Sequence, residues 1–132
     1  MTAKRGVPSN RVWSEVGYSR AVRIGQLIEV AGTSSSGPNG QILHAGDMYM
    51  QAKEVLRIIE EAINQLGGDL SDVVRTRVFV TDISRWREAG RAHGEAFAHL
   101  EVPPASAFYG VKALLHPDLL IEVEAEAIVG ES

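Results

Sequence analysis

The sequence predicts one α+β domain in which two helices cover the apolar face of a β-sheet. Two segments repeat apolar residues at helical spacing, and several short segments around them are rich in β-branched residues. The last of these segments alternates between apolar and charged side chains, which is typical of a strand with one buried face. Because 132 residues suffice for one core, we expect a single domain over residues 1–132.

Two strands are expected near the N-terminus, over residues 18–24 and 27–31, because both runs are rich in apolar and β-branched residues. Gly25-Gln26 joins them, which predicts a hairpin. The following run Ser36-Gly37-Pro38-Asn39-Gly40 is a cluster of turn-forming residues. The expected order is strand, strand, helix, strand, helix, strand, strand, with room for a third strand before the first helix.

The first helix is expected to follow Asp47, whose side chain can cap it, and to end at Gly67-Gly68. The second is expected to begin near Asp82 or Ser84. It must end before Pro103-Pro104, because the residue before a proline disfavours helical backbone. The stripe of the first helix is Met48, Ala52, Val55, Leu56, Ile59, Ala62, Ile63 and Leu66, and that of the second is Trp86, Ala89, His93, Phe97 and Leu100.

Three further strands are expected over residues 73–80, 105–114 and 119–129. In the last one, the apolar positions alternate with Glu122, Glu124 and Glu126, so the glutamates face away from the core. The same rule assigns one face of residues 73–80 to Val74, Thr76, Val78 and Val80, and the other to Val73, Arg75, Arg77 and Phe79.

The face opposite the helices is thus expected to mix arginines and glutamates with apolar side chains, namely Phe79, Phe108, Leu120 and Ile128. A solvated face does not need this apolar content, so we infer that another subunit covers it. The alternative is a solvated face on which opposed arginines and glutamates form weak cross-strand pairs.

Composition excludes several kinds of protein. The formal net charge of −4 disfavours nucleic acid as a partner, because phosphate binding needs clustered Lys and Arg. The chain has no cysteine, which agrees with a cytoplasmic location, and no apolar run approaches the roughly 20 residues of a membrane span. The histidines show no metal-ligand spacing and no glycine motif fits a dinucleotide, so neither a metal nor a cofactor is expected.

Four segments together carry a family resemblance. Val30-Ala31-Gly32 closes an early strand, residues 51–66 form a helix, residues 73–82 read VVRTRVFVTD, and Pro104-Ala105 leads to Ile121-Glu122-Val123-Glu124-Ala125. On these segments, from about residue 18 to residue 129, the chain resembles the reactive intermediate deaminase (Rid) family. Many members are labelled L-PSP endoribonucleases or translation inhibitors. The resemblance implies a chorismate-mutase-like mixed sheet, a homotrimer and three clefts between subunits.

The resemblance also implies a site. In deaminating members, an arginine after the Pro-Ala pair binds the carboxylate of an enamine or imine, and a glutamate on the last strand positions or activates water. Here Ser106 stands at the arginine position and Glu122 matches the glutamate. Lys112 lies about 20 Å further along the same strand, too far to replace the arginine. The other cations that could approach are Arg20, Arg75, Arg77 and Arg91.

The leading hypothesis is a Rid-like hydrolase of small enamines or imines, in which Glu122 positions water. Each site residue also has a plainer interpretation: Glu122 as the partner of an arginine, Tyr18 as packing, and Gly32 as the end of a strand. His93 is expected to be a packed core residue rather than a catalyst. The residues expected to line the ligand site are Tyr18, Ala31, Gly32, Ser106 and Phe108.

Two alternatives stay open. A non-catalytic, trimeric metabolite-binding protein would retain the cleft while the arginine is lost. An endoribonuclease or translation inhibitor rests on the family's label alone, and the acidic charge and the absence of a basic, aromatic patch oppose it.

Overall fold

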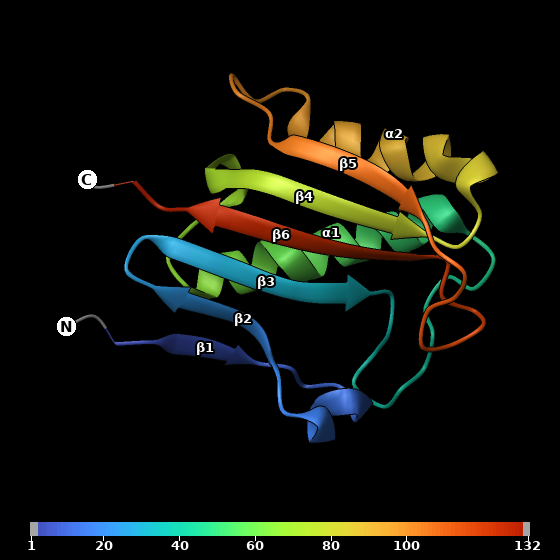
Figure 1. The fold of residues 1–132 in the computed structure, drawn as a ribbon, viewed down its shortest axis with the longest axis horizontal. Helices are drawn as coiled ribbons and strands as arrows, with labels where there is room; N and C mark the ends of the chain where they lie inside the picture. The colour runs from blue at the N-terminus through green and yellow to red at the C-terminus, as the bar shows by residue number, and fades with distance from the viewer. Residues whose placement is uncertain (1–2, 131–132) are drawn as a thin grey trace.

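The computed structural model describes residues 3–130, which form a six-stranded sheet with two α-helices packed on one face (Figure 1). The strand order is β1-β2-β3-β6-β4-β5, and all neighbours are antiparallel except β4 and β5, which are parallel. The fold is therefore α+β with a mixed sheet. Its elements are β1 (Arg5–Pro8), β2 (Ser19–Ile24), β3 (Leu27–Ser34), α1 (Met48–Gln65), β4 (Val73–Val80), α2 (Trp86–Phe97), β5 (Ala105–Gly110) and β6 (Ile121–Ile128).

Both ends of α1 are fixed by the residues that the sequence indicates. The Asp47 carboxylate accepts a hydrogen bond from a backbone N–H in the first turn. At the other end, the N–H groups of Gly67 and Gly68 donate to the carbonyls of Asn64 and Ile63. Gly67 has a φ of 89°, which a residue with a Cβ rarely adopts, so this position requires glycine.

The second helix is reached through a short 3₁₀ turn, Ile83–Arg85, in which Asp82 accepts a hydrogen bond from the Ser84 N–H. α2 then runs to Phe97 and ends before Pro103, as predicted. Within residues 3–130, neither this helix nor any other is both long and apolar enough to span a membrane.

The core lies between the helices and the sheet. Ile59 of α1 and Phe97 of α2 are almost completely buried, as are Val78 and Val123 on the facing strands. Burying a side chain of this size stabilises the fold by about 1.5–3 kcal/mol.

One buried polar residue shares this core. Gln51 of α1 is 0% exposed, donates to the Asp118 carbonyl at 2.9 Å and accepts from the Leu120 N–H at 2.9 Å. Gln51 therefore ties the first turn of α1 to the loop that enters β6.

The strands differ from the predicted ones in their number, in their bounds and in the direction of two side chains. β1 was not predicted; it pairs with β2 and contributes Val7 to the core. β3 continues to Ser34 through an irregularity between Val30 and Thr33, and β5 and β6 are shorter than predicted. The predicted faces of Val73 and Val74 are wrong: Val73 is buried and Val74 is exposed. The physical reason is a register shift between Val73 and Arg75, which interrupts the alternation.

Candidate functional site

Glu122 lies on the face of the sheet that the helices leave open. It is the second residue of β6, opposite Ser34 of β3 on one side and Phe79 of β4 on the other. Its chain neighbours Ile121 and Val123 are buried in the core, so the alternation turns the Glu122 carboxylate to the opposite face, as predicted. This carboxylate is only partly exposed.

Gly32 is in direct contact with this carboxylate. The irregularity in β3 places Ala31 and Gly32 between the paired residues Val30 and Thr33. A Cβ built on Gly32 would lie 2.8 Å from Glu122 Oε2 and 2.9 Å from Cδ. The absence of a side chain at Gly32 therefore lets the carboxylate lie against the β3 backbone.

Arg20 of β2 completes this cluster. Its Nη2 donates to the Gly32 carbonyl at 2.5 Å, and its guanidinium carbon lies 5.5 Å from the centre of the Tyr18 ring. Arg20 is only 6% exposed. The carbonyl of Ala31 is also engaged, because it accepts a hydrogen bond from the Thr33 hydroxyl.

The electrostatics of the cluster act on Glu122 in opposite directions. Burial raises the pKa of the Glu122 carboxyl above its ordinary value, and the negative charge of Glu124 raises it further. The positive charge of Arg20 lowers it. The net effect is a raised pKa, which makes the Glu122 carboxylate a stronger base toward water than an exposed glutamate.

Ser106 and Phe108 lie elsewhere in the chain. Because β5 runs parallel to β4, Ser106 pairs with Thr76 and Phe108 with Val78, both of which face the helices. Phe108 packs edge-on against the aromatic rings of Trp86 and His93. The expectation that Phe108 belongs to the charged face is therefore wrong. One chain brings Tyr18, Ala31, Gly32 and Glu122 together but does not bring Ser106 or Phe108 to them.

Ser106 belongs to a chain of hydrogen bonds with His93. The Thr76 hydroxyl lies 2.8 Å from His93 Nε2 and donates to Ser106 Oγ at 2.7 Å, and Ser106 Oγ donates to the Pro104 carbonyl at 3.3 Å. Ser106 Oγ also lies 3.4 Å from His93 Nε2, and which of these groups donates depends on the tautomer of the histidine. Burial also lowers the pKa of His93, which favours the neutral ring. The arrangement is that of a packed, hydrogen-bonded histidine, as the sequence predicts.

The rest of the open face mixes charges and aromatic rings. Arg77 Nη1 lies 2.7 Å from Glu126 and 4.0 Å from Glu124, so a cross-strand ion pair exists where alternation predicts one. Phe79 stacks on Tyr109, with ring centres 5.5 Å apart.

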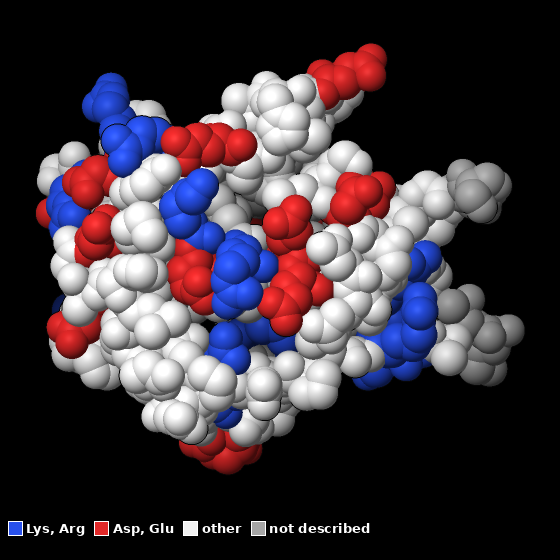
Figure 2. Space-filling model, turned by 180° about the vertical axis from the view of Figure 1, so that it is seen from behind, with Lys and Arg blue, Asp and Glu red and all other residues white. Residues whose placement is uncertain are grey.

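Positive and negative side chains also mix on the opposite, helix-covered face (Figure 2). Ion pairs there join Arg57 to Glu54 and Glu61, and Arg85 to Glu88. Across residues 3–130, His, Asp and Glu side chains form no group of three that could hold a metal ion.

Solved structures define the class of protein first. A protein from Mycobacterium tuberculosis, described as a member of the highly conserved YjgF/YER057c/UK114 family, is 47% identical, with a TM-score of 0.85 over 96% of this chain and 100% of that one. A protein of the conserved Rid family from Yersinia pestis is 26% identical, with a TM-score of 0.83 over 96% and 100% of the two chains. The fold is thus that of the small α+β proteins of the YjgF type.

Sequence comparison then gives the family. The family model described as Endoribonuclease L-PSP matches residues 8–129. An uncharacterised protein from Streptomyces coelicolor is 35% identical over 130 residues, covering 97% of this chain and 94% of that protein. A RutC family protein from Pyrococcus abyssi is 33% identical over 110 residues, covering 83% and 84%. This chain belongs to the L-PSP endoribonuclease family, which is also called the Rid family.

Proposed function

We propose that this protein hydrolyses small enamines or imines to a carbonyl compound and ammonia, with Glu122 as the base that acts on water. The observation that carries the proposal is the position of Glu122. Its carboxylate is partly buried, lies against the Gly32 backbone beside Tyr18 and Arg20, and has a raised pKa. A carboxylate in such a place can both orient a water molecule and accept its proton.

The reaction needs one proton carrier. As the water oxygen bonds to the imine carbon, Glu122 takes one proton from the water and the C=N electron pair moves to nitrogen. Glu122 then gives that proton to the nitrogen. When the C–N bond breaks, the remaining proton of the water follows the nitrogen, so one water is consumed and one ammonia is released.

The complete site requires a second subunit. Several apolar side chains on the open face are more than one third exposed in the single chain, and this surface is suited to contact with another copy. A trimer in which β5 of one subunit approaches β3 and β6 of the next would bring Ser106 and Phe108 toward a neighbour's Glu122. Light scattering should then report three times the 14.3 kDa chain mass, and a monomer at micromolar concentration would contradict the trimer. The exposed residues are Ile24, Leu27, Tyr109 and Ile128.

The substrate is expected to differ from that of deaminating relatives. At the arginine position, Ser106 offers one neutral hydroxyl in place of a two-pronged cation. Arg20 does not replace that arginine on the open face, because it is buried and already donates to the Gly32 carbonyl. We therefore expect imines without a carboxylate to be the better substrates.

The test compares freshly generated 2-imino acids with uncharged imines, using wild-type protein and the Ser106→Arg variant. The wild type should accelerate hydrolysis of the uncharged imines, and Ser106→Arg should gain activity mainly on the 2-imino acids. No acceleration of either class by the wild type would refute the hydrolase.

A trimeric metabolite-binding protein without catalysis is the second candidate, and the serine at position 106 favours it. In that case the uncharged imine or its carbonyl product would bind, and its rate of hydrolysis would equal that in buffer. Endoribonuclease activity, which the family's description names, has no further support in the mixed charges of the helix-covered face.

A further inference from the structure

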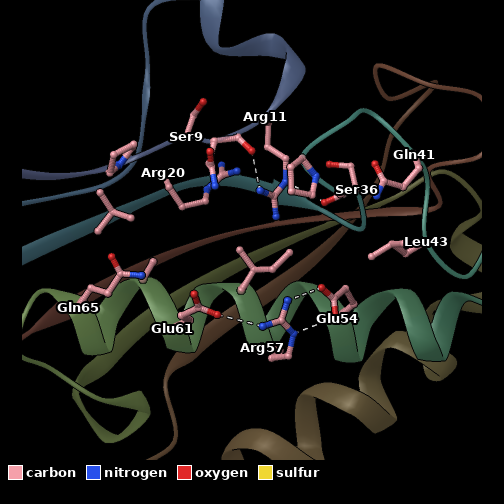
Figure 3. Close-up of a pocket in the computed structure, with 17 residues that line it drawn as sticks. Ser9, Arg11, Arg20, Ser36, Gln41, Leu43, Glu54, Arg57, Glu61 and Gln65 are labelled. Carbon is pink, nitrogen blue, oxygen red and sulfur yellow. Dashed lines mark hydrogen bonds and ion pairs between the residues drawn. The ribbon is translucent and has the colours of Figure 1, made fainter.

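A second candidate site lies away from Glu122, on the helix-covered side of the sheet. A cavity of about 500 Å³ opens between α1 and the segments that flank β1 and follow β3. Figure 3 shows its two walls: Ser9, Arg11, Arg20 and Ser36 on one side, and the polar face of α1 on the other. Pockets of this volume accommodate small metabolites.

Two buried polar atoms in the first wall have no partner. Among the described residues, Ser9 Oγ and Arg20 Nε make no hydrogen bond. Ser9 is 4% exposed and Arg20 is 6% exposed, so bulk water does not compensate for the missing bonds. Buried polar groups are nearly always hydrogen-bonded, because leaving one unpaired is costly. Both atoms are themselves almost inaccessible, so a ligand in the cavity would pair with them only after the Ser9 and Arg20 side chains turn toward it, which would remove the cost of the missing bonds.

The same wall carries two positive charges that form no direct ion pair among the described residues. Arg11 donates to the carbonyls of Ser36 and Asn10, and Arg20 donates to that of Gly32. Within residues 3–130, no carboxylate oxygen lies within 4.0 Å of either guanidinium. Burial has the largest effect on the pKa of Arg20 and lowers it; Tyr18 and Glu122 raise it, and the positive charge of Arg11 lowers it.

The opposite wall carries two negative charges and one positive charge. Arg57 of α1 is held by Glu54 at 2.7 Å and by Glu61 at 3.0 Å. The three arginines and two glutamates of the lining leave the cavity with a net charge of +1, and its positive side is the wall of Arg11 and Arg20.

We propose that this cavity binds a small oxyanion, the carboxylate or phosphate end of a metabolite. When the oxyanion binds, the Arg20 and Ser9 side chains turn toward it so that Nε and Oγ donate to its oxygens, and Arg11 supplies the second positive charge. The site goes beyond the proposed hydrolase, because neither Glu122 nor Tyr18 lines it. Arg20 links the two regions, since it lines the cavity and also donates to the Gly32 carbonyl beside Glu122.

The experiment titrates the whole protein with inorganic phosphate and, separately, with pyruvate, and follows backbone amide chemical shifts. At least one probe should give saturable shifts at Ser9 and Ser36. Arg11→Gln and Ser9→Ala should each weaken binding, Arg11→Gln by about tenfold or more, since it removes a charge-assisted contact. Arg87→Gln makes the same change on the exposed surface of α2 and should leave the affinity unchanged.

Saturation by phosphate alone would identify a phosphorylated ligand, saturation by pyruvate would identify a carboxylate, and both results support the site. The proposal is overturned if neither probe saturates, or if Arg87→Gln weakens binding as much as Arg11→Gln. Because the experiment measures binding in the absence of an imine, its result tests the oxyanion site independently of the proposed hydrolase activity.

Discussion

At the scale of single residues, the chemistry of the open face depends on the contact between Gly32 and Glu122. The carboxylate occupies space that a side chain at position 32 would need. Burial, Glu124 and Arg20 all affect the pKa of this carboxylate, and burial has the largest effect. A small change at Gly32 should therefore alter activity more than stability.

Gly32→Ala tests this contact. The new methyl group would displace the Glu122 carboxylate, which is the flexible end of a side chain, so we expect the fold to persist and imine hydrolysis to fall. Gly94→Ala is the matched control: a Cβ there meets nothing within 4 Å, and alanine should stabilise α2 by about 0.5–1 kcal/mol. Thermal unfolding and hydrolysis rates measure both effects. Full activity in Gly32→Ala would show that the close contact is not needed.

The dependence of hydrolysis on pH tests the electrostatics. The reaction needs ionised Glu122, so its rate should fall as the pH drops through the raised pKa, which lies above the ordinary value of 4.5. Removing the charge of Arg20 with Arg20→Gln should raise this pKa further and move the fall to higher pH. Arg87→Gln should leave the profile unchanged. A profile that Arg20→Gln moves to lower pH would contradict the assigned sign.

The raised pKa also predicts how stability depends on pH. Protonated Glu122 is favoured in the folded state, so its contribution to stability is complete below pH 4.5 and is lost as the pH rises through the folded-state pKa.

At the scale of elements, local sequence signals predict the helices well. Asp47 and Gly67-Gly68 bound α1 because caps act within a few residues of the helix end. β1 escapes prediction because only Val7 of its four residues enters the core, so it has no alternating pattern. The sequence does not predict which faces Val73 and Val74 occupy, because the bulge beside them forms only when β4 pairs with β6.

The candidate site is predictable only in part for the same reason. Alternation in the last strand places Glu122 opposite the core without any tertiary information. The strand pairings are long-range. The pairing of β3 with β6 brings Gly32 into contact with Glu122, and the pairing of β4 with β5 brings Ser106 within hydrogen-bond distance of Thr76. The sequence offers Arg20 as one of four candidate arginines, and nothing local distinguishes it from the other three.

Gln51 shows how one helix fixes the position of the site. Its side chain bonds the carbonyl of Asp118 and the N–H of Leu120, just before β6 begins. Gln51→Leu leaves both groups unpaired, so the free energy of unfolding should fall by about 1–3 kcal/mol for each group that stays buried. Gln65→Leu, at an exposed position of the same helix, should change it little. Urea denaturation measures both, and equal effects would contradict the tethering role.

At the scale of the whole molecule, one chain holds only part of the site that the family resemblance implies. Glu122 lies on the open face, whereas Ser106 belongs to the edge strand β5 and faces the helices. Assembly of several copies would join these regions, and the exposed apolar residues of the open face are suited to such an assembly. The cavity beside α1 is formed within the single chain, so its occupancy should not require assembly.

The most direct test of the account is the rate of hydrolysis of an uncharged imine by Glu122→Gln, compared with wild type and with Glu124→Gln. Glutamine keeps the shape of the side chain but cannot accept a proton, so Glu122→Gln should be slower by about 10²–10⁴-fold. Glu124→Gln removes a charge from the same face of the same strand and should retain most of the activity. Equal rates for wild type and Glu122→Gln would contradict the central claim that Glu122 activates water.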